Sequence, residues 1–215
     1  MDQAFSDRNA LLASIPRSQS DELLRNWGFD LFKETLVVLE HARLDPRAPV
    51  LELAAGSGRT TALLTRLGHR VIAGDLDFSR LPDLRRRTGG EHLHLVSLVK
   101  VNMERLAFRD HAAAFITCVN TLHEVDDPDR CLSELVRVHG SPGTLVLMEF
   151  NDEGFDRMQR LHEAVYQNDH TRGTVSHATV RRTLEAAYES VQIVETPLNT
   201  SYIATGKRFP QTPAR

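Results

Sequence analysis

The chain has few cysteines and no long apolar run, and both absences narrow its class. Only Cys118 and Cys131 occur among 215 residues, without the C-x-x-C spacing of zinc and redox sites. Because both fall in segments predicted to be buried, we expect reduced thiols in a cytosolic protein. No apolar stretch approaches the roughly 20 residues of a membrane helix, and the polar start MDQAFSDRNA does not resemble a signal peptide. We therefore expect a cytoplasmic protein without a membrane partner.

An excess of charge of one sign is also missing. The formal net charge is -3 and the pI is near 6.4, which indicates no general attraction to nucleic acid. The cationic run 85–87 ends a predicted helix, where cations complement the helix dipole, and no aromatic residues alternate with it. The ten histidines do not form a tract, so no metal site is predicted. A nucleic-acid partner is not expected, and the oligomeric state stays open.

A regular alternation of strand-like and helix-like segments is present instead. The predicted strands are 50–55, 70–76, 94–102, 113–120, 144–150, 191–195 and 201–205, and the tripeptide SPG is expected to turn the chain into the fifth. Such an alternation predicts an α/β fold with a mostly parallel sheet and helices on both faces. The length allows one domain with a sizeable core.

The first 48 residues precede the sheet and are predicted to be helical. They either pack on the sheet or form a lid over a ligand site, and we treat 1–48 as a helical lid segment. Residues 49–207 are then the ligand-binding domain. Residues 208–215, which are basic and contain proline, are expected to form a tail.

The stretch VLELAAGSGRT places a turn of small residues between the first strand and a helix. Residues 54–58 leave the backbone nearly bare, and the helix that follows presents unpaired N–H groups. Asp75 ends the neighbouring strand, where a carboxylate accepts hydrogen bonds from ribose hydroxyls. A dinucleotide fingerprint requires a small residue at the position of Thr61, so that match is poor. Glu52, within the first strand, suits a ligand with an ammonium group better than a pyrophosphate.

Taken together, residues 50–150 resemble the class I S-adenosylmethionine-dependent methyltransferases. Their first motif, acidic-x-Gly-x-Gly-x-Gly, is matched by Glu52, Ala54, Gly56 and Gly58. Alanine in place of the first glycine requires that Ala54 avoid a positive φ. The segment VNMERLAF resembles the motif after the third strand, and FITCVNTLHEVDDPDRC resembles the fourth motif.

The resemblance implies a Rossmann-like three-layer sandwich whose seven strands run in the order 3-2-1-4-5-7-6, with strand 7 antiparallel. It implies S-adenosylmethionine as the cofactor, S-adenosylhomocysteine as its product, and methyl transfer to an acceptor. Asn102 stands where an acidic residue normally contacts the adenine amine, and its side-chain oxygen retains an acceptor. The implied cofactor-binding residues are Glu52, Ala54, Gly56, Ser57, Gly58, Asp75, Leu76, Asn102, Met103 and Asn120.

The acceptor in this family lies over the ends of strands 4 and 5. The candidate catalytic residues are His123, Glu124 and Tyr166, and Glu149 ends strand 5 nearby. His123 is a candidate general base. Met158, His162, Tyr166 and Asp169 are spaced to share one face of a helix predicted over 152–169. The candidate substrate-binding residues are His162, Asp169, His170 and Arg172.

A small-molecule acceptor is preferred because no added recognition domain is evident. The alternatives are an RNA or protein methyltransferase, an NAD-type oxidoreductase, and a protein that binds the cofactor without turnover. The sequence does not identify the acceptor or the atom that is methylated.

Overall fold

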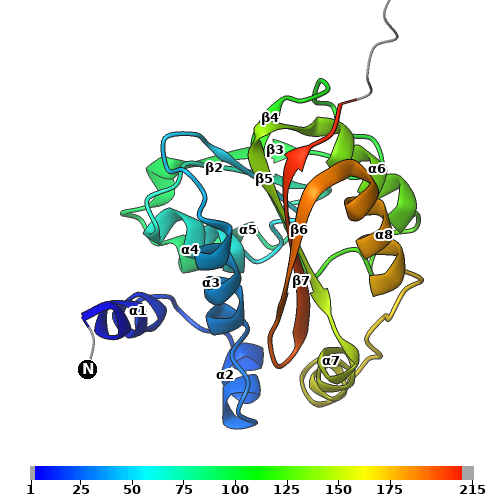
Figure 1. The fold of residues 1–215 in the computed structure, drawn as a ribbon. Helices are drawn as coiled ribbons and strands as arrows, with labels where there is room; N and C mark the ends of the chain where they lie inside the picture. The colour runs from blue at the N-terminus through cyan, green and yellow to red at the C-terminus, as the bar shows by residue number, and fades with distance from the viewer. Residues whose placement is uncertain (1–2, 210–215) are drawn as a thin grey trace, which may run out of the picture.

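The computed structural model describes residues 3–209, which fold around one mixed β-sheet (Figure 1). Within these residues the seven strands run in the order β3-β2-β1-β4-β5-β7-β6, and β7 is antiparallel to both β5 and β6. The strands are β1 (Val50–Leu53), β2 (Val71–Asp75), β3 (Val96–Lys100), β4 (Ala113–Val119), β5 (His139–Phe150), β6 (Tyr188–Glu195) and β7 (Asn199–Lys207). The predicted Rossmann-like fold and strand order are confirmed.

Helices cover both faces of the sheet. They are α1 (Gln3–Ala13), α2 (Gln19–Asn26), α3 (Leu31–Ala42), α4 (Arg59–Arg66), α5 (Leu81–Thr88), α6 (Pro128–Val138), α7 (Asp152–Val165) and α8 (His177–Ala187), with a 3-10 turn, η1 (Leu93–Leu95). Because side chains alternate along a strand, Val146 and Met148 pack with α3 and α4, whereas Leu145 and Leu147 pack with α6 and α8. This double burial explains the apolar strands. Within residues 3–209, no helix is both long and apolar enough to cross a membrane.

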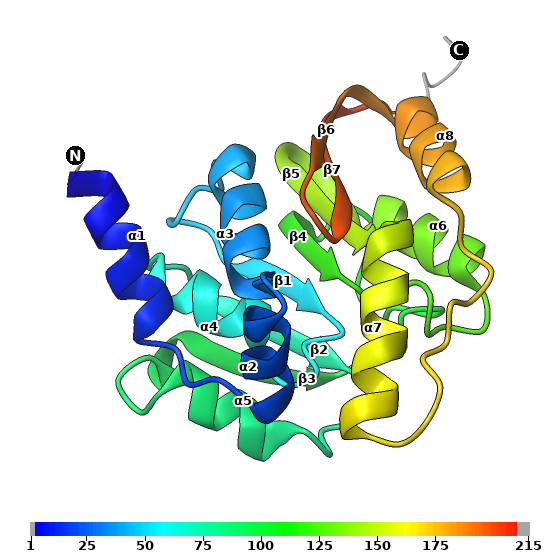
Figure 2. The ribbon, with the colours of Figure 1, turned by 90° about the horizontal axis from the view of Figure 1, so that it is seen from below.

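Helices α2 and α7 lie beyond the carboxyl ends of the parallel strands (Figure 1), and Figure 2 shows both from that side. Leu24 and Leu31 form a third core with Phe155 and Leu161 of α7. Parallel sheets bind ligands at this edge, so the two helices flank the expected site.

The predicted N-terminal segment 1–48 divides between two positions. Phe32, Leu36 and Leu39 of α3 belong to the main core, so this helix packs on the sheet. Helix α2 lies at the ligand-binding edge, where its role as a lid stays a prediction. The predicted domain boundary between residues 48 and 49 falls between α3 and β1. Of the predicted tail, residues 210–215 lie outside the described residues.

The expectation that SPG turns the chain into the fifth strand is wrong. Strand β5 begins at His139, and residues 140–143 form a bulge in it opposite Ala114 of β4. A Cβ on Gly143 would lie 1.9 Å from the Ala114 carbonyl oxygen. Only glycine permits the backbones of β4 and β5 to approach this closely. The glycine of SPG, which suggested a turn, therefore lies in a bulge.

Candidate functional site

The chain leaves β1 through a turn with three left-handed residues. The φ angle is +56° at Ala54, +49° at Gly56 and +77° at Gly58, which is the N-cap of α4. The expectation that Ala54 avoids a positive φ is therefore wrong. Reversal of the chain from β1 into α4 takes Ala54 into the left-handed region, at a cost of roughly 1–2 kcal/mol for a residue with a Cβ.

The two glycines of this turn serve different contacts. A Cβ on Gly56 would enter open space, with the nearest atom, the Ala54 carbonyl oxygen, at 4.0 Å. A Cβ on Gly58 would instead lie 2.7 Å from Leu84 of α5, so Gly58 permits two helices to pack. Gly56 thus supplies the bare backbone that a bound nucleotide requires.

The turn opens into a cavity of about 520 Å³ at the carboxyl ends of β1, β2 and β4. The cavity brings together these predicted site residues: Glu52, Ala54, Gly56, Ser57, Asp75, Asn120, His123, Glu124, His162, Tyr166 and His170. The other predicted site residues lie elsewhere: Gly58, Leu76, Asn102, Met103, Asp169 and Arg172.

Glu52 holds the first turn of α4, and Asp75 holds the glycine turn that precedes it. Glu52 is buried, and its carboxylate accepts hydrogen bonds from Thr61 N at 3.0 Å and Thr61 Oγ1 at 2.6 Å. Burial raises the pKa of this carboxyl to about 8. Asp75 Oδ2 accepts the Gly56 N–H at 2.7 Å. Each oxygen of the Asp75 carboxylate keeps a second lone pair for a ligand.

The residues that were predicted to contact adenine have other neighbours in the structure. Asn102 is exposed, and its Oδ1 accepts the Glu104 N–H at 2.8 Å. Met103 is buried in the core that α6 and α8 cover. Leu76, beside Asp75, is 62% exposed. The assignment of these three residues to the cofactor stays a prediction.

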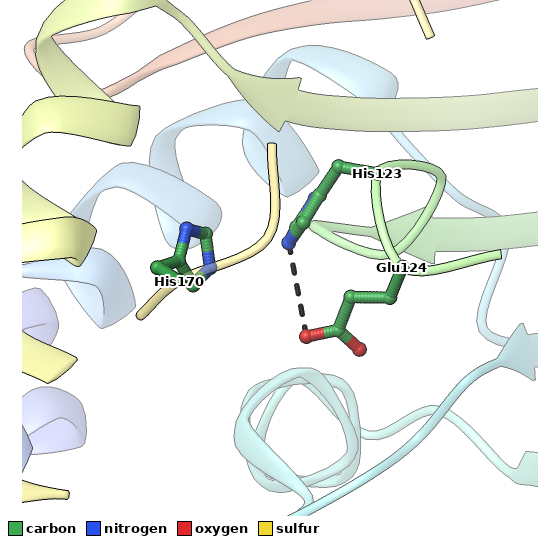
Figure 3. A group of neighbouring side chains, drawn as sticks. All are labelled: His123, Glu124 and His170. Carbon is green, nitrogen blue, oxygen red and sulfur yellow. Dashed lines mark ion pairs between the residues drawn. The ribbon is translucent and has the colours of Figure 1, made fainter. Parts of the chain in front are cut away.

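His123 forms a buried pair with Glu149. Its Nδ1 lies 2.7 Å from Glu149 Oε1, and the two side chains are 1% and 2% exposed. A carboxylate only accepts hydrogen bonds, so Nδ1 carries a proton, and in the neutral imidazole Nε2 then has the lone pair. Nε2 is buried, and among the described residues it has no hydrogen-bond partner. It lies 3.7 Å from Glu124 Oε1, as the dashed line in Figure 3 marks.

Aromatic rings surround His123 on the side of α7. The ring centroids of His123 and His170 are 5.0 Å apart, and His162 lies between His170 and Tyr166 at 4.7 Å and 5.0 Å. Burial, together with His123 and His162, lowers the pKa of His170 to about 4. Tyr166 Oη donates to Ser20 Oγ of α2 at 3.2 Å, so the two helices meet across the site.

Helix α7 is shorter than predicted, and this moves two candidates. The helix ends at Val165, and Gln167 adopts a left-handed φ of +57°. Asp169 therefore lies in the following loop, where it accepts a hydrogen bond from Gln159, and it does not share the helical face of Tyr166. Arg172 forms an exposed ion pair with Asp152.

A charge network joins α2 to the turn, and the sequence did not indicate it. Asp21 contacts Arg59 at 3.1 Å and Arg87 at 2.6 Å, and Arg87 also donates to the Ser57 carbonyl at 3.0 Å. Although burial opposes this, Arg59 and Arg87 hold the pKa of Asp21 well below its usual range. The run 85–87 ends α5 as predicted, but Arg87 is buried within it. Cavity residues that the sequence missed are Ser20, Leu31, Leu53, Arg59, Thr60, Arg80, Arg87, Val119, Thr121, Phe150, Leu161 and Asn168.

Comparison with known proteins confirms the class. Residues 51–147 match the family model described as Methyltransferase domain. A SAM-dependent methyltransferase from Aquifex aeolicus shares the fold, with a TM-score of 0.60 and 20% identity, over 87% of this chain and 98% of that one. Residues 51–147 thus match a methyltransferase domain and the fold is the class I fold, as predicted, and S-adenosylmethionine is the cofactor that this resemblance indicates.

Two curated relatives give closer sequence matches. The demethylmenaquinone methyltransferase of Thermobifida fusca is 39% identical over 112 residues, which are 51% of this chain and 48% of that protein. The ubiquinone/menaquinone biosynthesis C-methyltransferase UbiE of Legionella pneumophila is 32% identical over 137 residues, 62% of this chain and 54% of that protein. The chain spans about half the length of the curated relatives it matches.

Proposed function

We propose that the chain transfers a methyl group from S-adenosylmethionine to a carbon atom of a small acceptor that carries an ionisable hydroxyl. The observation that carries this proposal is the His123–Glu149 pair, which presents an unshared Nε2 lone pair at the cavity. This nitrogen takes the proton of the acceptor's hydroxyl as the acceptor carbon bonds to the methyl group. Glu149 stabilises the resulting imidazolium. The relatives' names, which refer to quinones and to C-methyltransferases, support such an acceptor.

The cavity fits the cofactor on three observations. Gly56 leaves open space where a Cβ would stand, and Glu52 and Asp75 line the same side. Asn120 Oδ1 is buried, and within residues 3–209 it has no hydrogen-bond partner, so it suits a ligand N–H or ammonium group. S-adenosylmethionine would supply a methyl group bound to a sulfonium leaving group. The chain's contribution is to position the acceptor beside His123.

The acceptor's side of the cavity is formed by residues from two helices. His162 of α7, Tyr166 directly after α7 and Ser20 of α2 line it, together with His170 and the exposed carboxylate of Glu124. We assign His162 and His170 to acceptor binding, and Glu124 and Tyr166 to orientation of its polar groups. Asp169 and Arg172, which lie in the loop beyond, receive no role in this proposal.

A small molecule is favoured over RNA or protein by the same site. Arg87 is buried against Asp21, so the run 85–87 is not an uninterrupted basic surface for phosphates. We propose a cytosolic location because Cys118 and Cys131 are both buried free thiols and form no disulfide within the described residues.

The first test is calorimetric titration with S-adenosylhomocysteine, with NAD⁺ in parallel. Methyl transfer is then measured from labelled S-adenosylmethionine to a dihydroxynaphthalene as the acceptor probe, in the wild type and in His123→Asn. We expect His123→Asn to bind S-adenosylhomocysteine normally and to lower kcat by roughly 10²-fold or more. Transfer at the wild-type rate would overturn the role of His123. Tight cofactor binding without transfer to any hydroquinone would favour a non-catalytic protein.

A further inference from the structure

Three side chains at the cavity converge from segments that are far apart in the sequence. His123 and Glu124 follow β4, whereas His170 follows α7. Each offers one ligand atom, and the three atoms lie within 4.8 Å of one another. Figure 3 shows His170 on one side of the His123 ring and the Glu124 carboxylate on another.

We propose that this cluster binds a divalent transition-metal ion such as Zn²⁺. The ligands are His123 Nε2, a ring nitrogen of His170 and the carboxylate of Glu124. Two imidazoles and one carboxylate form a donor set that zinc accepts readily. Because all three residues line the cavity, a fourth coordination position would face the space within it.

His123 is already oriented as a metal ligand. Its Nδ1–H is held by the buried Glu149 carboxylate at 2.7 Å, the arrangement in which an outer carboxylate fixes the tautomer of a ligating imidazole. The opposite nitrogen is buried and has no partner among the described residues. An unpaired buried acceptor costs about 1–3 kcal/mol, which a bound cation would relieve.

The distances require only small movements of mobile groups. Ligand atoms 2.0–2.1 Å from a tetrahedral zinc ion are about 3.3 Å apart. His123 Nε2 and Glu124 Oε1 are 3.7 Å apart, and the Glu124 side chain is 63% exposed and free to rotate. His170 lies in a loop, so it can approach without disturbing a helix or strand.

The metal site is an addition to the proposed methyl transfer, and both functions use the same atom, His123 Nε2. A nitrogen that coordinates a metal has no lone pair for a proton. The metal-bound protein therefore cannot use His123 as a base, and the metal-free protein can. Zinc and proton abstraction are alternative uses of the same imidazole.

The test is calorimetric titration of chelator-treated, metal-free protein with ZnCl₂. We expect one site per chain in the wild type and at least tenfold weaker binding in His170→Ala. His94→Ala, which removes an exposed imidazole distant in the fold from the cluster, should bind zinc as the wild type does. Titration of each variant with S-adenosylhomocysteine shows whether the fold is retained.

Absence of zinc uptake by the wild type would overturn the proposal, as would equal affinity in wild type and His170→Ala. Methyl transfer by a protein that binds no zinc would refute the metal site alone. Conversely, zinc binding without any methyl transfer by the metal-free protein would refute the proposed function and leave the metal site in place.

Discussion

Glu52 is buried beneath the glycine turn, and its replacement by glutamine tests the electrostatics of the site. Burial raises the pKa of this carboxyl from 4.5 to about 8, although two hydrogen bonds from Thr61 favour the charged form. The unfolded chain ionises this group above pH 4.5, whereas the folded chain keeps the proton until about pH 8. The contribution of Glu52 to wild-type stability therefore falls between these pH values and is constant above them. At 1.36 kcal/mol per pKa unit, the full loss is about 5 kcal/mol.

Glu52→Gln removes the titration and keeps the contacts. The amide oxygen can accept the Thr61 N–H, and the amide NH₂ can donate to Thr61 Oγ1. The difference in free energy of unfolding between Glu52→Gln and the wild type is measured in urea. We expect it to shift by about 3 kcal/mol in favour of the variant between about pH 5 and pH 8. The exposed control Glu91→Gln should differ from wild type by no more than about 0.5 kcal/mol throughout. A difference for Glu52→Gln that stays constant with pH would refute the reasoning.

Three other substitutions test the turn and its supports. Asp75→Ala should weaken S-adenosylhomocysteine binding by about 1.5–3 kcal/mol in calorimetry, because it removes a charged acceptor; unchanged affinity would contradict the ribose assignment. Ala54→Gly should leave the free energy of unfolding in urea unchanged or raise it by up to about 1 kcal/mol, because glycine tolerates the left-handed φ. Ala186→Gly, at an exposed position in the last turn of α8, should lower it by up to about 1 kcal/mol, and equal losses would argue against strain at Ala54. Arg87→Ala should lower stability by about 1.5–3 kcal/mol in urea unfolding, because it removes a charged hydrogen-bond partner of a buried carboxylate that Arg59 still contacts. Arg85→Ala, from the same run, should change it by no more than about 0.5 kcal/mol, and matching effects would show that the buried pair stabilises nothing.

The order and type of the elements were predictable because local patterns determine them. Apolar runs buried on both faces marked the strands, and Gly68 marked the end of α4. Element ends were less predictable. Ser18 caps α2 with Asp21 as its capping-box partner, although Ser20 and Asp21 are also residue types that favour the N-cap position. Tertiary contacts determine which residue caps α2, because Arg87 of α5 also holds the Asp21 carboxylate.

The cofactor side of the site followed from sequence more closely than the acceptor side did. Glu52, Gly56 and Asp75 lie within one βαβ unit, so their spacing alone brings them to one edge of the sheet. The acceptor side depends on contacts between distant segments. Strand order predicted that His123 and Glu149 would be near each other, but not that the carboxylate would take Nδ1–H and leave Nε2 toward the cavity.

The same reasoning explains why a metal cluster could not be seen in the sequence. His170 reaches His123 only because α7 stops at Val165 and the left-handed Gln167 redirects the chain. A helix continued to Asp169, as its spacing suggested, would have carried the loop in another direction. Helix termination, a local event with a weak sequence signal, therefore decides which imidazoles share the cavity.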